Sequence, residues 1–380
     1  MSNQRASFLL AILFIWVSFS SYAQRSRVGV YDDWETNRRK QIVDLYSFDA
    51  YMPKEGLKSV DFPSFLNKER AVSAYRPEEV MLVVSVGREH KAYPLSTLMY
   101  RPVINDRIGG TPVAVTYCPL TDQAVVWKRS FNYKGQTREV VFRTSGLLRN
   151  SNTVLYDQFT ESWWQQYTGQ ALVGEFAGVE LEMLSAMRMK VKDFYAYYPY
   201  GLTLTDKVRE DIFPYGETPY YQYDQQFRKK PLLLRYMPES LLAAMERVAV
   251  VHVMNEQMIY PFEEIRKNGV INDKPMGMYL TLFYTEDIPS MHDERVIKDS
   301  KKVGHVVAYS SFLDGQLLTF AKEENNTFRD EETQSVWRLD GTCIEGSLKG
   351  KQLKAVVHTT SFAFAPTVFY PKATIYNFSW

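Results

Sequence analysis

Short apolar runs that end at glycine or at polar residues recur along the chain, and they predict many strands. Residues 80–86 read VMLVVSV and stop at Gly87, which is typical of a buried strand. Residues 248–254 read VAVVHVM and repeat that pattern. Further runs predict strands at residues 111–117, 123–127 and 139–143.

Short helices are expected where a proline follows two of these strand regions. Apolar residues at positions i, i+3 and i+4 follow Pro94, and a similar spacing follows Pro261. These residues are Leu95, Leu98 and Met99 in the first segment, and Phe262 and Ile265 in the second. The Asn-Asp pairs at residues 105–106 and 272–273 predict turns.

The chain also resembles itself. Tyr93-Pro94 recurs 167 residues later as Tyr260-Pro261, and the Val-Ile-Asn-Asp run at 103–106 recurs at 270–273 with the same offset. Such self-similarity is the signature of a repeated unit. The sequence therefore predicts an α+β, strand-rich fold made of two pseudo-symmetric copies of a mixed or antiparallel β unit with short helices. We place the copies at residues 80–204 and 247–376.

Three segments lie outside the copies. Residues 1–23 have the features of a signal peptide: Arg5, an apolar run at 8–19 and a small-x-small site ending at Ala23. We expect a periplasmic or secreted protein, although the segment could instead remain as an uncleaved anchor. Residues 24–79 form an N-terminal segment, and 205–246 form a Tyr- and Pro-rich strap that ends in a helix at 239–245. No later segment is predicted to span a membrane.

The charge balance narrows the classes of partner. The 45 basic residues balance 44 acidic ones, so no electrostatic feature favours nucleic acid or an acidic membrane. The aromatic content is high, with 26 Tyr, 22 Phe and 7 Trp. Rings with a polar edge suit half-buried strands and wet grooves. A small molecule, a glycan or a protein is the expected kind of ligand.

Residues that occur in only one copy are the better candidates for function, because shared residues are explained most simply by the common scaffold. The segment Tyr117–Asp122 is such a stretch: at an offset of 167, Cys118 corresponds to Thr285. A cysteine at a strand end could bind metal or react. The alternative is an inert, buried thiol.

Other candidate residues surround this segment in the sequence. Arg101 and Asp122 are possible neighbours of Cys118, while Arg143 and Asn150 either line a cleft between the copies or cap loops. Cys118 and Cys343 could form a disulfide between the halves, or they could be unrelated thiols. The five histidines lack the spacing of a local metal motif. No metal is therefore predicted, and any cofactor is left open.

A set of motifs resembles a known family. The set comprises residues 91–95 (KAYPL), 103–106 (VIND), 109–112 (GGTP), 116–120 (TYCPL) and 162–164 (SWW). Together they resemble the DUF3179 family, a domain of unknown function, so the resemblance implies no activity. Similar members tend to carry a His before the Val-Ile-Asn-Asp run and a second Cys in Cys-Pro-Leu-Cys. This chain has Arg101 or Pro102 and Thr121 there, which weakens a metal or dithiol mechanism.

Three hypotheses for function follow. The first is a non-catalytic module that binds a ligand or a protein outside the cytoplasm. The second is a degenerate metal-binding or redox protein centred on Cys118. The third is a structural subunit of a cell-envelope assembly, with the strap as its contact surface.

Overall fold

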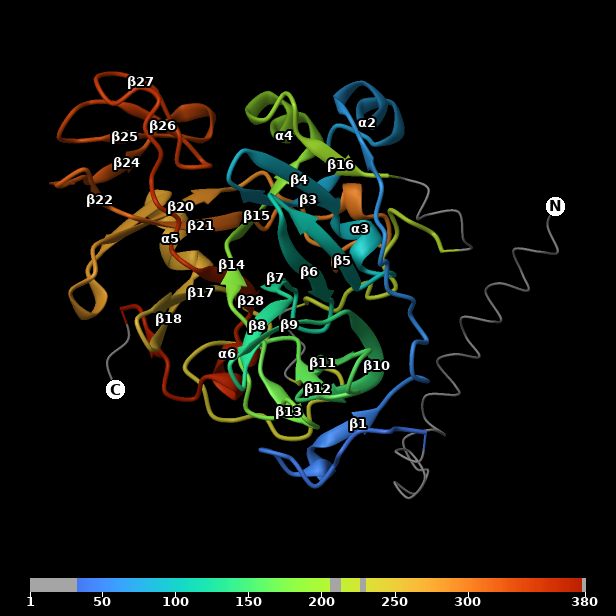
Figure 1. The fold of residues 1–380 in the computed structure, drawn as a ribbon. Helices are drawn as coiled ribbons and strands as arrows, with labels where there is room; N and C mark the ends of the chain where they lie inside the picture. Colours follow the sequence, from blue (N-terminus) through green and yellow to red (C-terminus); the bar gives the residue numbers. More distant parts are fainter. Residues whose placement is uncertain (1–32, 206–212, 226–229, 378–380) are drawn as a thin grey trace.

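The computed structural model describes residues 33–205, 213–225 and 230–377. The expected signal segment lies outside these residues. The described chain is strand-rich with few short helices (Figure 1), which confirms the α+β prediction. None of its helices is long and apolar enough to cross a membrane.

Two sheets form the body of residues 80–204, called the first half below. One has the strand order β15-β3-β4-β16-β2 and the other has the order β14-β7-β6-β5. The strands of the first sheet are β2 (Phe65–Leu66), β3 (Val80–Val86), β4 (Glu89–Pro94), β15 (Ala186–Lys190) and β16 (Leu202–Leu204). Those of the second are β5 (Val103–Ile108), β6 (Thr111–Cys118), β7 (Gln123–Lys128) and β14 (Met183–Leu184).

A third sheet joins the N-terminal segment to the first half. Its order is β1-β10-β11-β12-β13, and β8 pairs with β9 beside it. The strands are β1 (Phe48–Ala50), β8 (Ser130–Tyr133), β9 (Gln136–Glu139), β10 (Phe142–Arg149), β11 (Asn152–Asp157), β12 (Trp163–Gln165) and β13 (Ala171–Val173). The helices of this part are η1 (Leu45–Ser47), α2 (Lys68–Ala74), α3 (Leu95–Leu98) and α4 (Val191–Tyr197).

Residues 247–376, called the second half below, contain sheets of order β28-β17-β18-β29, β19-β20-β21 and β24-β25-β26-β27, and a β22-β23 pair. The first two sheets contain β17 (Arg247–Val253), β18 (Glu256–Pro261), β19 (Val270–Asp273), β20 (Leu280–Thr285), β21 (His305–Ser310), β28 (His358–Phe362) and β29 (Thr374–Ile375). The others contain β22 (Phe312–Leu313), β23 (Gln316–Leu317), β24 (Phe320–Lys322), β25 (Thr327–Asp330), β26 (Val336–Arg338) and β27 (Cys343–Glu345). The helices are η3 (Pro275–Gly277), η4 (Ile297–Asp299), η5 (Glu324–Asn326), α5 (Phe262–Asn268) and α6 (Phe364–Phe369).

The apolar runs form strands where the sequence predicts them. β3 has the predicted bounds, and its residues Val80 to Val84 are buried. Both faces of the strand are therefore shielded from water over these residues. Short helices also begin directly after Pro94 and Pro261, as α3 and α5. Gly269 ends α5 in the left-handed conformation, at φ 71°, which costs glycine little.

The predicted Asn-Asp turns are wrong, because both pairs lie inside strands. The Asn105 amide donates to the Phe142 carbonyl at 2.9 Å and accepts from the Phe142 N–H at 2.9 Å. Asp106 accepts a 2.6 Å hydrogen bond from Tyr93. Asn272 makes the same two bonds to Phe320. A polar side chain that supplies the missing backbone partners of a neighbouring strand is stable within a sheet.

The helix predicted at residues 239–245 is also wrong, because the segment consists of bends and turns. Its apolar residues do not share one environment. Leu242 packs with Val248 and Val250, whereas Met245 packs in a different cluster with Cys118. Burial in two directions prevents the single apolar face that an amphipathic helix needs.

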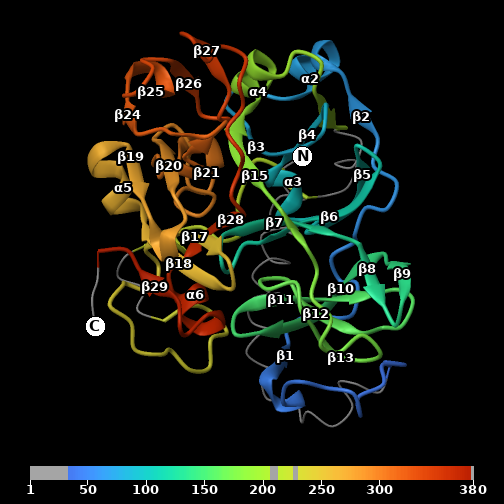
Figure 2. The same ribbon diagram turned by 60° about the vertical axis from the view of Figure 1, so that its left-hand side comes forward.

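Several local arrangements occur in both halves. β16 lies parallel to β4, with Leu202 opposite Lys91, and β29 lies parallel to β18, with Thr374 opposite Met258. A buried tryptophan donates to a buried aspartate in each half. The two pairs are Trp164 with Asp157 at 3.1 Å and Trp337 with Asp330 at 2.8 Å. The sheets of the two halves stand side by side (Figure 2).

The halves share their cores. Ile288, Met291 and Ile297 of the second half pack in the cluster that contains Tyr117 of the first. The strap contributes Tyr223, which is buried with Cys118 and Phe362. The two halves therefore fold around common apolar contacts rather than as separate bodies.

Candidate functional site

The segment Tyr117–Asp122 comprises the last two residues of β6 and the tight turn that leads to β7. Two backbone hydrogen bonds close the turn. The Thr121 N–H donates to the Cys118 carbonyl and the Asp122 N–H donates to the Pro119 carbonyl, each at 3.3 Å. Asp122 has a φ of 52°, which is uncommon outside glycine and is tolerated best by Asn and Asp. The turn directs the Asp122 carboxylate inward, where it is buried.

Asp122 is the centre of a buried charge network. Its carboxylate lies 3.0 Å from the Arg188 guanidinium and 3.3 Å from that of Arg247, and it accepts a 3.0 Å hydrogen bond from Tyr117. Burial alone would raise the pKa of Asp122, but the charges of Arg188 and Arg247 hold it well below its usual value.

A second buried aspartate extends this network into the strap. Arg247 lies 3.0 Å from Asp224, and Asp224 accepts a 2.7 Å hydrogen bond from Ser290. His292 contacts the Pro119 carbonyl at 2.8 Å through Nε2. Residues from the first half, the strap and the second half thus meet around Asp122. A carboxylate compensated by two arginines is a structural anion rather than a proton acceptor at neutral pH.

Both cysteines are free and buried. Cys118 packs with Leu120 and Tyr167, whereas Cys343 packs with Phe283 and Trp337 in another cluster. The disulfide considered between them is absent from the structure, because the two thiols belong to different parts of the core. Within residues 33–205, 213–225 and 230–377, no group of three or more His, Cys, Asp or Glu side chains is arranged to hold a metal ion.

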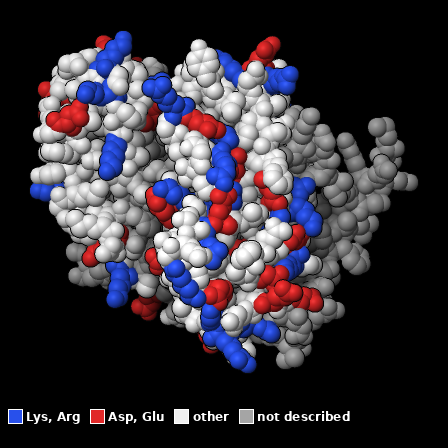
Figure 3. Space-filling model, in the orientation of Figure 1, with Lys and Arg blue, Asp and Glu red and all other residues white. Residues whose placement is uncertain are grey.

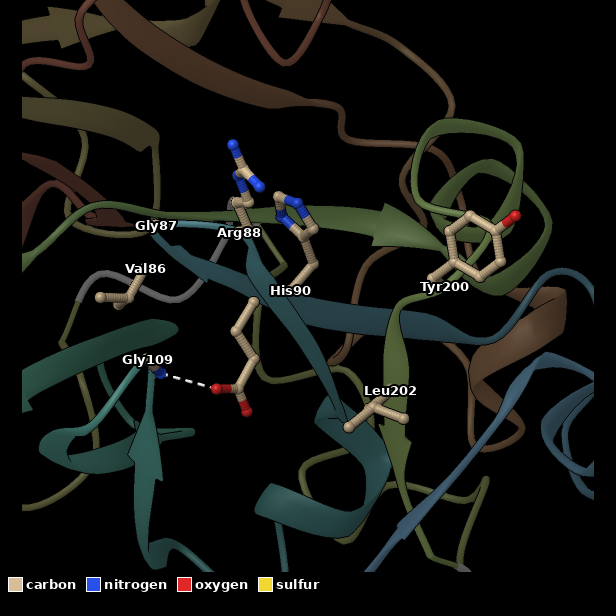
Figure 4. A pocket seen from close by; sticks show the side chains of 8 residues that line it. Val86, Gly87, Arg88, His90, Gly109, Tyr200 and Leu202 are labelled. Atoms are coloured by element: carbon tan, nitrogen blue, oxygen red, sulfur yellow. Dashed lines mark hydrogen bonds between the residues drawn. The ribbon is translucent and has the colours of Figure 1, made fainter.

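An open surface hollow lies on the first half, away from the charge network. Its volume is about 530 Å³, and Val86, Arg88, Glu89, His90, Gly109, Tyr200 and Leu202 are among its lining residues. Figure 4 shows Tyr200 and Leu202 on one side of this hollow and Arg88 and His90 across from them. A second hollow of about 520 Å³ has Asn67, Lys68, Glu69, Val72 and Tyr200 in its wall. Tyr200 therefore stands between the two, and its side chain is 97% exposed.

The loop that carries Tyr200 is held in place from both sides. Tyr198 stacks on His90 with the ring centroids 4.1 Å apart, and burial together with the nearby Asp340 of the second half raises the pKa of its phenol. A Cβ on Gly201 would lie 2.4 Å from Cζ of Phe194, so this position has room only for glycine. These contacts fix the backbone on either side of the exposed ring.

A family comparison covers most of the chain. The model of a family described as "Protein of unknown function (DUF3179)" matches residues 54–373. The chain belongs to this family. No curated protein and no solved structure matches it. The matched region of this DUF3179 protein contains the first half, the strap, the second half up to residue 373, and both hollows.

The residues predicted as a site in this DUF3179 protein are placed apart. Tyr117 and Asp122 meet, as described. Arg143 instead pairs with Asp61 at 2.5 Å and donates to Ser59 at 2.7 Å. The Arg101 guanidinium lies 5.9 Å from the centroid of the Phe213 ring. Asn150 has a φ of 53° at the turn between β10 and β11, a conformation that asparagine tolerates better than most residues.

Sequence reasoning missed the partners of Asp122 and the exposed Tyr200. Arg188, Arg247 and His292 lie far from Asp122 in the chain, and no local motif connects them. Tyr200 did carry a usable signal. Pro199 and Pro371 set an offset of 172 in the sequence, which places Lys372 at the position of Tyr200, and Leu202 and Thr374 keep the same offset in their strand pairings. The tyrosine is therefore not part of what the halves share.

Proposed function

We propose that this DUF3179 protein is an exported, non-catalytic binding protein whose ligand lies across Tyr200. The observation that carries the proposal is a tyrosine ring, 97% exposed, on a fixed loop between two hollows. Aromatic rings with a polar edge are favoured at binding surfaces, because they bring contact area at a small cost in side-chain entropy.

Internal duplication supports the same assignment. We propose that the two halves are copies of one unit, from the paired Trp-Asp bonds and the matching parallel strands. Residues retained in both copies then belong to the scaffold. Tyr200 corresponds to Lys372, and α2, which borders the second hollow, precedes the first copy. The surface around Tyr200 is thus an addition to the common unit.

The segment around Cys118 supports catalysis less well. The thiol is fully buried, and Asp122 is compensated by two arginines. A nucleophile or a general base has to reach its substrate. Export is proposed from the signal segment at residues 1–23 alone.

A thermal-shift screen tests the binding role. Mature protein beginning after Ala23 is mixed with panels of oligosaccharides, peptides and small metabolites, and a ligand at about 100 times its Kd stabilises the fold by about 2.7 kcal/mol. We expect at least one compound to raise the Tm of the wild type and of Tyr236→Ala but not of Tyr200→Ala. Tyr236 is a matched control, since it is 74% exposed and lies in the strap. Shifts that are equal in all three proteins would contradict the proposal.

A further inference from the structure

We infer that the ligand of the Tyr200 surface is an uncharged glycan chain; this inference rests on the binding role proposed above. Tyr200 is 97% exposed, so its phenol ring is accessible to a ligand. The C–H groups on one side of a pyranose ring pack flat on the face of a phenol ring, while the sugar hydroxyls around the rim stay in water. A ring that is apolar on its face and polar at its edge suits this contact.

The shape of the surface favours a chain over a compact ligand. Tyr200 lines the hollow of about 530 Å³ and also the one of about 520 Å³. A ligand centred on the ring therefore extends into both. The hollows are open rather than enclosed, whereas pockets for drug-sized molecules bury about 70–90% of the ligand surface. A ligand held on an open groove keeps most of its polar groups hydrated, as a glycan does.

The charges around the ring favour an uncharged ligand. One hollow is bordered by Arg88 and Glu89, and the other by Lys68 and Glu69. Each hollow thus carries one cation and one carboxylate. The face of the molecule in Figure 3 likewise shows acidic and basic side chains interspersed. Because the two charges in each hollow offset each other, an acidic or basic polymer would gain no net electrostatic attraction on either side of Tyr200.

The polar groups suit hydroxyls. The Glu89 carboxylate accepts a 2.7 Å hydrogen bond from the Gly109 N–H and lies 3.2 Å from Lys91, so its position is fixed. His90 is held by Ser85 at 2.7 Å through Nδ1. A hydroxyl both donates and accepts hydrogen bonds, so paired carboxylate and cationic groups can serve it without a net charge on the ligand.

The strand beside Tyr200 disfavours an extended peptide. Peptides commonly bind by adding a strand to a free sheet edge. β16 has no free edge at Thr203, because this residue pairs with Ala92 of β4 on one side and with Leu66 of β2 on the other. A peptide would be left with side-chain contacts alone, whereas a glycan needs no backbone pairing.

Affinity electrophoresis tests this inference. The mature protein and its variants are run in gels that contain hydroxyethylcellulose, glucomannan, dextran or laminarin, all uncharged. We expect at least one polymer to retard the wild type, Tyr200→Phe and Tyr236→Ala, and Tyr200→Ala to bind it at least about tenfold more weakly, as loss of a stacked ring predicts. Titration of the matching hexasaccharide into each protein measures the ratio. Circular dichroism verifies that Tyr200→Ala is folded.

Parallel probes separate this inference from the binding role. Polygalacturonate tests an acidic glycan, and a library of random heptapeptides tests a peptide ligand. Binding of either one that requires Tyr200, with no binding of the neutral polymers, overturns the glycan assignment and leaves the binding role standing. If no probe of any class distinguishes Tyr200→Ala from the wild type, both proposals fall.

Discussion

At the scale of single residues, Asp122 shows how a candidate catalytic group can be structural. Its segment differs between the halves and contains a cysteine, which favoured a reactive site from sequence. In the structure Arg188 and Arg247 compensate its charge. The sequence predicted that Tyr117 and Asp122 belong together, because they share one turn. It could not predict the arginines, since only the tertiary fold brings them to the turn.

Loss of the Asp122 charge is expected to destabilise the protein strongly. Asp122→Asn leaves the buried Arg188 guanidinium without its counterion, whereas Arg247 keeps Asp224; breaking a buried ion pair in this way typically costs about 3–5 kcal/mol. Urea unfolding at pH 7.5 measures the loss. The exposed pair Lys128–Glu182 supplies the control, because Glu182→Gln should change stability by less than about 1 kcal/mol. Equal effects of the two substitutions would show that Asp122 is not a buried counterion.

The cysteines are expected to remain thiols. Alkylation of the unfolded protein without reductant should modify both Cys118 and Cys343, because they lie in separate apolar clusters. In the folded protein both should react slowly, since they are buried. Mass spectrometry reads both results. An unmodified protein whose mass is lower by two hydrogens would reveal a disulfide and contradict this placement.

At the scale of elements, apolar periodicity predicted most strands well, because burial alone determines that pattern. The bounds of β3 and the helices after Pro94 and Pro261 are examples. Asn105 is an exception. An Asn-Asp pair favours a turn, but the Asn105 amide bridges β5 and the start of β10. Local propensity carries no information about a partner 37 residues away.

The bridging asparagines provide a test at this scale. Asn105→Ala removes both partners of the Phe142 backbone in a buried site, and we expect a loss of about 2–4 kcal/mol, since each unsatisfied buried group costs about 1–3 kcal/mol. Asn272 makes the same bonds to Phe320 but is exposed, so water can replace it. Asn272→Ala should therefore cost less than half as much in urea unfolding. The reverse order would contradict the account of these strands.

At the scale of the whole molecule, the second half contains three buried histidines, and two of them lie near residues of the first half. His292, His305 and His358 are all buried, and burial lowers the pKa of each imidazole. The charge of Arg188 lowers the pKa of His305 further, whereas the charge of Asp122 raises it. Within the described residues, neither ring nitrogen of His305 has a hydrogen-bond partner. A neutral imidazole is therefore the form that fits between the halves.

Acid is expected to lower the free energy of unfolding. The unfolded chain binds protons on these histidines near pH 6.5, whereas the folded protein does not. Stability is thus full above pH 6.5 and falls as the pH drops below that value, by up to about 1.4 kcal/mol per pH unit for each histidine. Asp122 does not contribute to this pH dependence of stability, because its pKa lies below this pH range in both the folded and the unfolded protein. Urea unfolding at pH 7.5 and 5.0 should show a smaller difference for His305→Gln than for the wild type. An unchanged difference would mean that His305 is protonated in the folded protein.

The most direct test of the binding account observes Tyr200 itself. The mature protein is labelled with 3-fluorotyrosine, and the Tyr200 signal is assigned as the one missing from the fluorine spectrum of Tyr200→Phe. Addition of the hexasaccharide selected by electrophoresis should shift or broaden the Tyr200 signal and leave that of Tyr236 unchanged. A ligand that binds while the Tyr200 signal stays in place would show that the ligand lies elsewhere, and it would contradict the account.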